Sequence, residues 1–309
     1  MILSVIIPAY NEEKTIARVI AGIPRKISGV EMVSVIVIDD GSEDRTSEEA
    51  KKAGADIVIR HRKNMGLAVS FRQGLDAALE NNSGAIINID ADGQYDSSEI
   101  PKIAEPILSG KADLVLTNRK VLSLLHMPLA KKMGNKIATL VTRLVSGYNV
   151  LDAQSGFRAF SREAALRMNV LSNYTYVQET IIQAVFKGLA IVQVDCTFSP
   201  REGKSRLIKS LLNYAISAGL TIVRTFTHYR SLKFFAGIGA VVMLAGMVLG
   251  GKVFIHFLAT GSVSPFIPTA ILSSMLMIIG FQVALLGLLS DAIYGNRKML
   301  EEILYRMKK

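Results

Sequence analysis

The chain of 309 residues carries a net charge of +10, has a pI near 9.6 and is 50% hydrophobic, with a mean hydropathy of +0.33. Its length allows a sizeable core and an additional module, and its lone cysteine, Cys196, excludes an internal disulfide and fits a reducing compartment. The cations gather at 201–233 and 297–309, beside apolar stretches, and no RNA-binding signature appears, so an anionic lipid or a small anionic substrate is favoured over nucleic acid as a partner.

Short apolar runs rich in β-branched residues alternate with helically spaced segments as far as Phe198. Strands are predicted at residues 3–8, 33–38, 57–59, 85–89 and 113–117, and helices at 12–23, 46–53, 66–79 and 99–109. This alternation predicts a mostly parallel, doubly wound α/β sheet. Ligands bind such sheets beyond the carboxyl ends of the strands, which is where the polar clusters of this sequence fall.

Two apolar stretches, 234–257 and 266–289, are each long enough for the roughly 20 residues that a membrane-spanning helix needs. Basic residues crowd their outer flanks and the loop between them has no charge, so the positive-inside rule predicts both termini in the cytosol. A hairpin buried in a soluble core is the alternative. The predicted organisation is a domain at 1–205, amphipathic juxtamembrane helices at 206–232, two transmembrane helices at 233–294 and a basic cytosolic tail at 295–309. For residues 206–232, a soluble helix packed on the domain is a serious alternative.

Three acidic clusters follow predicted strands. Asp90-Ala91-Asp92 ends the fourth strand, and two carboxylates on one turn can bind Mg²⁺ or Mn²⁺ together with substrate phosphates. Asp39-Asp40-Gly41-Ser42 follows the second strand, and the segment 8–13 (PAYNEE) follows the first. Each cluster alone could be only a capped turn. Three of them at one edge of a sheet favour a ligand site.

Together with residues 152–158 (DAQSGFR), these motifs resemble the inverting family 2 glycosyltransferases of the GT-A fold, and among them the polyprenyl-phosphate glycosyltransferases such as dolichyl-phosphate mannose synthase. The resemblance covers roughly residues 1–210, and the apolar hairpin matches bacterial and archaeal members with two C-terminal spans. It implies a Rossmann-like GT-A domain followed by a transmembrane hairpin in the cell membrane, with the catalytic domain in the cytosol. Relatives with this hairpin suggest a homotetramer.

The activity implied by the resemblance is transfer of one hexose from a nucleotide sugar to dolichyl or undecaprenyl phosphate, with inversion. The amino-acid sequences of the DAQSGFR motif and of residues 174–179 favour a UDP-sugar, such as UDP-glucose or UDP-N-acetylglucosamine, over GDP-mannose. A processive polysaccharide synthase is disfavoured because the chain has no Q-x-x-R-W motif and only two spans. A non-catalytic membrane scaffold would be expected to lose one of the acidic clusters, and all three are intact.

For the donor, the resemblance implies that the nucleoside is held by Pro8, Tyr10, Glu12, Ile38 and Asp40. The Mg²⁺ or Mn²⁺ ion and the diphosphate would be taken by Asp90, Ala91, Asp92 and Gln94. A basic loop that would close over the diphosphate carries Arg201, Lys204 and Arg206.

For the acceptor phosphate, the resemblance implies contacts with Arg119, Lys131 and Asn135, with Lys131 standing where relatives often have arginine. Asp152 and Glu179 would orient the acceptor site. A lipid phosphate is mostly ionised at neutral pH, because its second pKa is about 6, so it needs no general base. All four histidines are therefore interpreted as structural: His61, His126, His228 and His256. A sugar hydroxyl as acceptor would instead need Glu179 as the base.

Overall fold

The computed structural model describes the chain except for residues 125–126, 171–175 and 201–230. The chain divides into two compact units, residues 1–218 with 308–309 and residues 219–307. The juxtamembrane segment predicted at 206–232 lies almost entirely outside the described residues, so the domain boundaries expected there stay predictions.

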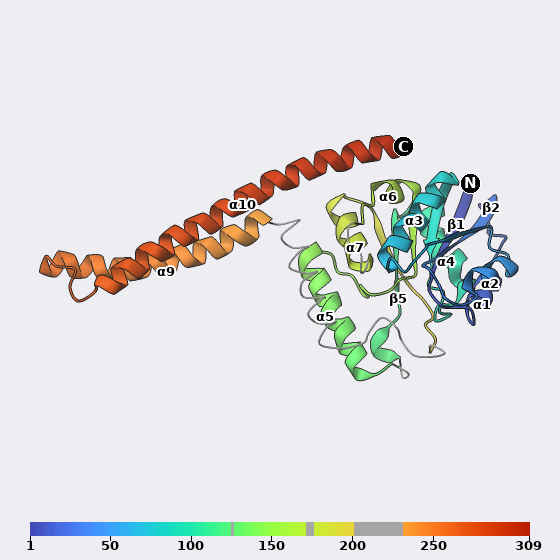
Figure 1. Cartoon of the computed structure of the whole chain (residues 1–309), viewed down its shortest axis with the longest axis horizontal. Coiled ribbons are helices and arrows are strands. Elements are labelled where there is room, and N and C mark those ends of the chain that lie inside the picture. Colours follow the sequence, from blue (N-terminus) through green and yellow to red (C-terminus); the bar gives the residue numbers. More distant parts are fainter. Residues whose placement is uncertain (125–126, 171–175, 201–230) are drawn as a thin grey trace. The chain divides into compact units, whose positions relative to one another are not determined.

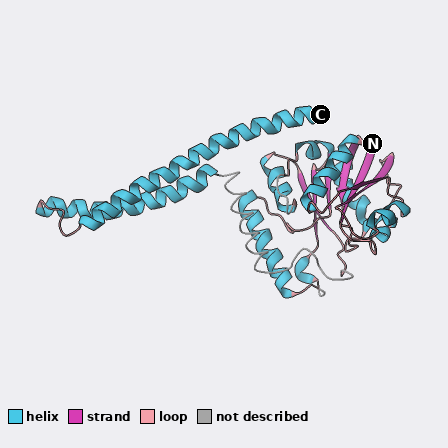
Figure 2. Cartoon of the chain, in the orientation of Figure 1, coloured by secondary structure: helices cyan, strands magenta, loops and turns pink. Residues whose placement is uncertain are grey.

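The first unit is built on one seven-stranded sheet (Figures 1 and 2). Its strands are β1 (Ile2–Ala9), β2 (Met32–Asp39), β3 (Ile57–Arg60), β4 (Ser83–Asn88), β5 (Leu114–Asn118), β6 (Arg158–Ser161) and β7 (Ile191–Asp195). The spatial order is β3-β2-β1-β4-β6-β5-β7. Strand β6 runs antiparallel to β4 and β5, and the other four pairings are parallel. The expected α/β class with a mostly parallel sheet is confirmed.

Helices cover both faces of this sheet (Figure 2). They are α1 (Ile16–Ala21), α2 (Thr46–Lys52), α3 (Leu67–Glu80), α4 (Ile100–Leu108), α5 (Leu129–Ser146), α6 (Arg162–Arg167) and α7 (Val177–Phe186), with 3₁₀ turns η1 (Ser97–Glu99) and η2 (Val121–Ser123). Alternate residues of a strand point to opposite faces. Leu3, Val5 and Ile7 of β1 accordingly join the core formed with α1, α2 and α4.

The opposite face of the sheet is covered by α3. Gly74 permits the close approach of this helix, because a Cβ there would lie 2.9 Å from Cδ1 of Ile38 and 3.2 Å from Cβ of Ile6. The buried strands β1 and β2 are therefore fixed from both sides, and their carboxyl ends form a rigid edge on which a site can be built.

The second unit contains two long apolar helices, α9 (Ser231–Thr260) and α10 (Ile267–Lys308). Their most apolar windows have mean hydropathies of 2.1 and 2.2 and are only 11% and 17% buried. The helices approach closely through small residues: Oγ of Ser273 donates to the carbonyl of Gly246 at 2.8 Å, and a Cβ on Gly280 would lie 2.8 Å from the carbonyl oxygen of Gly239. Length and exposed apolar surface make them candidate membrane spans rather than the core of a soluble protein.

Candidate active site

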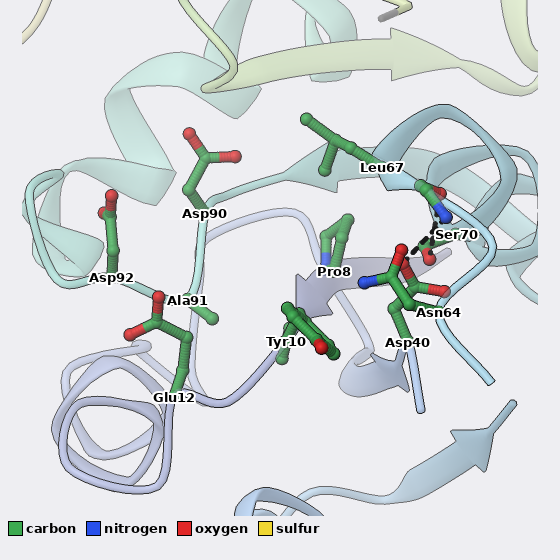
Figure 3. A pocket seen from close by; sticks show the side chains of 12 residues that line it. Pro8, Tyr10, Glu12, Asp40, Asn64, Leu67, Ser70, Asp90, Ala91 and Asp92 are labelled. Atoms are coloured by element: carbon green, nitrogen blue, oxygen red, sulfur yellow. Dashed lines mark hydrogen bonds between the residues drawn. The ribbon is translucent and has the colours of Figure 1, made fainter. Parts of the chain in front are cut away.

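A pocket of about 310 Å³ opens at the carboxyl ends of β1, β2 and β4. Figure 3 shows three polar side chains, Asp40, Asn64 and Ser70, on one side and three carboxylates, those of Glu12, Asp90 and Asp92, on the opposite side. The complete lining is Pro8, Ala9, Tyr10, Glu12, Asp40, Asn64, Gly66, Leu67, Ser70, Asp90, Ala91 and Asp92. The three acidic clusters of the sequence therefore meet around one cavity.

Asp40 is oriented by the chain around it. Its carboxylate is buried and accepts hydrogen bonds from the backbone N–H groups of Met65 at 2.8 Å and Gly66 at 2.9 Å. Nδ1 of His61 lies 2.7 Å from Oδ1 of Asp40, and Nε2 of the same ring contacts Oε1 of Gln73. The carboxylate is thus set at the pocket wall before any ligand binds, and His61 supports it from behind.

The loops after β1 and β2 are hydrogen-bonded to each other. The backbone N–H of Asn11 donates to Oγ of Ser42 at 2.9 Å, and that of Glu12 donates to Oγ1 of Thr46 at 2.8 Å. Gly41 has a φ of +73°, and a Cβ there would lie 2.5 Å from the carbonyl carbon of Lys63. Only glycine fits this position, beside the loop that follows β3. The hydrogen bonds hold the two motif loops together as one wall of the pocket.

Asp90 and Asp92 lie on the turn after β4, and both are half-buried. The backbone N–H of Gln94 donates to Oδ1 of Asp92 at 3.1 Å. Gly156 packs directly against Asp90, since a Cβ at that position would lie 2.8 Å from its Oδ2. The glycine of the DAQSGFR motif leaves the space that the Asp90 carboxylate occupies.

The oxygen donors of this turn fit a hard divalent cation. Among the described residues, no group of three or more His, Cys, Asp or Glu side chains could form a complete protein cage for a metal. Mg²⁺ and Mn²⁺ commonly take one or two carboxylates and complete their shell with water and substrate phosphate, which matches Asp90 and Asp92. These two residues could hold the ion together with a diphosphate.

Gln94, the third predicted ligand, connects the D-x-D turn to another segment. Its Nε2 donates to the carbonyl of Ser199 at 3.1 Å, and its own carbonyl accepts the N–H of Ser199 at 2.8 Å. The turn is thereby fastened to the chain just before residue 201. Its role toward a metal stays a prediction.

Arg119, Asp152 and Asn135 form a second, largely buried network. Nε of Arg119 donates to Oδ2 of Asp152 at 2.7 Å and Nη2 donates to Oδ1 at 3.0 Å, a bidentate pair whose side chains are 10% and 2% exposed. Nδ2 of Asn135, on α5, donates to the same Oδ1 at 3.0 Å. The guanidinium lies 5.0 Å from the ring centroid of Phe198, within cation–π range.

Both members of this pair are charged at neutral pH. Burial alone would raise the pKa of Asp152, but the charge of Arg119 and the hydrogen bonds that it donates hold that pKa below its usual range. Burial likewise opposes the charge on Arg119, yet the electrostatic influence of Tyr95 and Asp152 raises its pKa. The pair is a buried salt bridge in which each charge compensates the other.

Arg158, the last residue of the DAQSGFR motif, is fully buried beneath this network. It donates to the carbonyl of Ser155 at 2.8 Å, to that of Ala153 at 3.3 Å and to Oγ1 of Thr180 at 2.6 Å. Burial lowers the pKa of Arg158 to about 10, so it stays charged at neutral pH. Its hydrogen bonds fasten the loop that carries Asp152 to the first turns of α7.

The structure places most of the predicted donor residues at the pocket: Pro8, Tyr10, Glu12, Asp40, Asp90, Ala91 and Asp92. Ile38 is fully buried in β2 and packs beside Gly74, away from the lining. The basic-loop residues Arg201, Lys204 and Arg206 lie outside the described residues.

On the predicted acceptor side, the structure brings together Arg119, Asn135 and Asp152. Lys131 is exposed on α5, four residues before Asn135 and so on the same helix face. Glu179 is half-buried in the first turn of α7, where its Oε1 accepts from Nε2 of Gln183 at 3.2 Å. The role of Glu179 toward the acceptor stays a prediction.

The sequence reasoning missed the loop between β3 and α3, which supplies Asn64 and Gly66 to the pocket, and the first turn of α3, which supplies Leu67 and Ser70. A signal was present, because His61, Asn64 and Gly66 follow the third predicted strand just as the acidic clusters follow the others. Because none of the three carries a carboxylate, they were not recognised as a polar cluster like the acidic ones.

Comparison with known proteins gives consistent matches. The model of the family described as glycosyl transferase family 2 matches residues 4–167. The UDP-N-acetylglucosamine–dolichyl-phosphate N-acetylglucosaminyltransferase of Methanococcus voltae is 34% identical over 217 residues, covering 62% of this chain and 84% of that protein. Glycosyltransferase AglJ of Haloferax volcanii is 26% identical over 302 residues, covering 97% of this chain and 96% of that protein.

Among solved structures, glucosyl-3-phosphoglycerate synthase from Mycobacterium tuberculosis, in complex with Mn²⁺, UDP-glucose and phosphoglyceric acid, is similar with a TM-score of 0.55 at 23% identity. The match covers 73% of this chain and 78% of the synthase chain. A similarity at this identity shows that the two proteins share the fold of the first unit.

Proposed function

The chain belongs to glycosyl transferase family 2, and from this premise we propose that it transfers one hexose, with inversion, from a nucleotide sugar to dolichyl or undecaprenyl phosphate. The observation that carries the proposal is the pocket in which Asp40 faces Asp90 and Asp92 across one cavity. A nucleotide sugar needs one surface that binds its nucleoside and another that binds its diphosphate through a cation. The side with Asp40 suits the nucleoside, and the side with Asp90 and Asp92 suits the cation and the diphosphate.

On the donor side, Asp40 and Tyr10 bind the nucleoside, and the half-buried carboxylates of Asp90 and Asp92 lie where the diphosphate is expected. The chemistry that Mg²⁺ or Mn²⁺ supplies there is neutralisation of the charge that develops on the leaving diphosphate. The solved synthase that shares the fold was crystallised with Mn²⁺ and UDP-glucose, which supports a UDP-sugar and Mn²⁺ as the first choices to test.

On the acceptor side, the lipid phosphate binds near Arg119. A guanidinium has five N–H donors, and the pair with Asp152 uses two of them, so pairing orients the group and retains capacity for a phosphate. Lys131, exposed on α5 near Asn135, supplies a second cation. The dolichyl-phosphate acceptor in the name of the Methanococcus voltae relative supports this choice.

The apolar helices α9 and α10 support an acceptor that resides in a lipid bilayer. With basic residues on the outer flanks of both helices, the first unit is expected on the cytosolic side of the membrane, where nucleotide sugars are available. A homotetramer stays a prediction.

Product analysis tests the proposal. Membranes containing the protein are offered UDP-N-acetylglucosamine, UDP-glucose or GDP-mannose with a short polyprenyl phosphate, and Asp92→Asn membranes serve as the control. The expected product is a lipid-linked monosaccharide phosphate of inverted anomeric configuration, formed best from a UDP-sugar. A polymer as product, or preferred transfer to a free sugar hydroxyl, would overturn the acceptor assignment and make Glu179 the base to test.

A further inference from the structure

Helix α5 presents a row of large apolar side chains to solvent. Their exposed fractions are 78% for Leu129, 54% for Met133, 57% for Ile137, 54% for Leu140 and 67% for Leu144. The spacings of four, four, three and four residues place all five on one side of the helix, within an arc of about 80°. We call these five residues the α5 stripe.

The opposite side of α5 is already packed against the protein. Buried there are Ala138, Thr139, Thr142, Val145 and Ser146. An amphipathic helix in a soluble protein turns its polar side outward, but α5 turns a mostly apolar side outward and buries several hydroxyls. The five side chains of the α5 stripe therefore contribute little to the buried core of the described part of the first unit.

The exposed apolar residues of the first unit concentrate around this helix. Among the described residues up to Pro200, ten large hydrophobic residues are exposed. Seven of them lie between Leu122 and Leu151, and the other three are single methionines elsewhere. Scattered exposed hydrophobics are ordinary, but a contiguous row of this kind marks a binding surface.

The charged residues in the sequence around the stripe are all positive. Between Leu114 and Leu151 the sequence contains no Asp or Glu and six Lys or Arg residues. Three of them, Lys132, Lys136 and Arg143, follow one border of the stripe at helical spacing. An apolar row bordered by lysine and arginine is the pattern of helices that lie in the interface of an anionic bilayer.

From this juxtaposition we propose that the α5 stripe inserts into the interfacial region of an anionic lipid bilayer, so that the first unit contacts the membrane directly in addition to the contact made through α9 and α10. The occupant of the stripe is lipid because every charged residue of α5 is a cation. A second copy of the chain would bring its own cations against these and would have to offset their repulsion.

This contact has a consequence for the site. Asn135, which holds Asp152, lies on the same helix as the stripe, so one helix connects the lipid surface to the Arg119–Asp152 network. The membrane contact itself does not depend on the acceptor being a lipid phosphate, because it rests only on the exposed stripe and its charged border.

Site-specific quenching in the full-length protein tests the proposal. The protein is reconstituted in vesicles of phosphatidylcholine and phosphatidylglycerol, in a Cys196→Ser background with a single label at Ile137→Cys. The matched control carries the label at Lys51→Cys, on the exposed side of α2. Both positions are exposed, so neither substitution removes a core contact. A nitroxide on the lipid acyl chain should quench the Ile137 label strongly and iodide should quench it weakly, whereas the Lys51 label should show the reverse.

A second variant examines the charged border. In the double variant Lys132→Glu, Lys136→Glu, lipid quenching of the Ile137 label should weaken. The partition of the stripe from water into lipid should fall by at least about fivefold for each lysine lost. The weakening should occur with anionic vesicles and be small with neutral ones.

Two outcomes would overturn the proposal. Iodide quenching of the Ile137 label equal to that of the Lys51 label would mean that the stripe faces water. Protection of the Ile137 label from both quenchers would mean that protein, either another copy or another part of this chain, covers the stripe. None of these readouts requires turnover, so they are independent of whether the proposed transfer reaction is correct.

Discussion

The donor pocket and the Arg119–Asp152 network place charges in opposite ways. In the pocket, Asp90 and Asp92 lie half-buried on one turn, so two like charges are held close together at the edge of a cavity. In the network, the side chains of Arg119 and Asp152 are almost fully shielded from solvent, and their opposite charges neutralise each other. The first arrangement suits a cationic ligand, whereas the second pairs its opposite charges within the protein. Substitutions in the pocket should therefore change turnover, and substitutions in the network should also change stability.

The largest effect is expected from Asp92→Asn. Removal of one carboxylate from the D-x-D turn weakens the binding of the cation that offsets the leaving diphosphate, so turnover should fall by about three orders of magnitude. The thermal midpoint in detergent should change little, because the side chain is half-exposed. Turnover and thermal unfolding are measured on the same preparations with and without EDTA. Wild-type turnover in EDTA would remove the metal from the reaction.

The next largest effect is expected from Arg119→Ala. Loss of a cation from a partly desolvated charge contact costs about 2 to 5 kcal/mol, so transfer to polyprenyl phosphate should fall by roughly two orders of magnitude or more. Nucleotide-sugar affinity should change little, because the pocket is built from other strand ends. Both substrates are titrated against wild type and variant.

Arg119→Lys is the control that separates charge from geometry. Lysine keeps the positive charge but lacks the fork that binds Asp152 in a bidentate manner, so transfer should recover only in part. Normal transfer to lipid phosphate by Arg119→Ala would contradict the acceptor role of Arg119.

A smaller effect on turnover but a clear one on stability is expected from Asp152→Asn. The substitution leaves Arg119 buried without a counter-charge, which typically costs about 3 to 5 kcal/mol. Asp195→Asn is the matched control, because Asp195 pairs with Lys120 at 2.8 Å on the exposed surface and such pairs are worth about 0 to 1 kcal/mol. Denaturant unfolding in detergent should show a large shift for Asp152→Asn and almost none for Asp195→Asn. Equal shifts would mean that the buried pair of Arg119 and Asp152 contributes no more to the free energy of unfolding than the exposed pair does.

The smallest effect concerns pH. Because the folded-state pKa of Asp152 is lowered, its stabilising contribution is fully present above its unfolded pKa of about 3.9 and is lost as pH falls through the lower folded value. The difference in stability between wild type and Asp152→Asn should therefore be constant from pH 7 to about pH 5 and should shrink in more acidic solution. A difference that grew on acidification would have the wrong sign for this mechanism.

The contrast between the two regions also separates what the sequence could predict from what it could not. The five strands β1 to β5 and helices α1 to α4 were predicted because their apolar runs are buried, regular and bounded by polar turns. The pocket followed from the same pattern, since polar clusters at the carboxyl ends of neighbouring strands must converge.

Strand β6 was missed, because its four residues begin with Arg158, and a charged residue argues against a buried strand unless its partners are known. These partners, such as Thr180 and the carbonyl of Ser155, are distant in sequence or come from backbone atoms. The pairing of Arg119 with Asp152 was likewise beyond sequence reasoning, which placed both at the acceptor site but could not show that they bind each other. Helix α5 escaped prediction although its periodicity is clear, and its outward-facing apolar residues become unusual only once the buried side is known.

The position of β6 between β4 and β5 has a consequence for how the protein is made. Strand β6 is synthesised after both of its neighbours, and β4 and β5 do not pair with each other. The edge of β4 away from β1 and the facing edge of β5 therefore stay unpaired until residues 158–161 are made. Strands β1 to β4 pair among themselves and can assemble earlier. At about 5 to 20 residues per second, the apolar edge of β4 stays open for several seconds on the ribosome. Until β6 inserts, the nascent chain carries the kind of unpaired strand edge that recruits other chains, so this interval is when it most needs a chaperone.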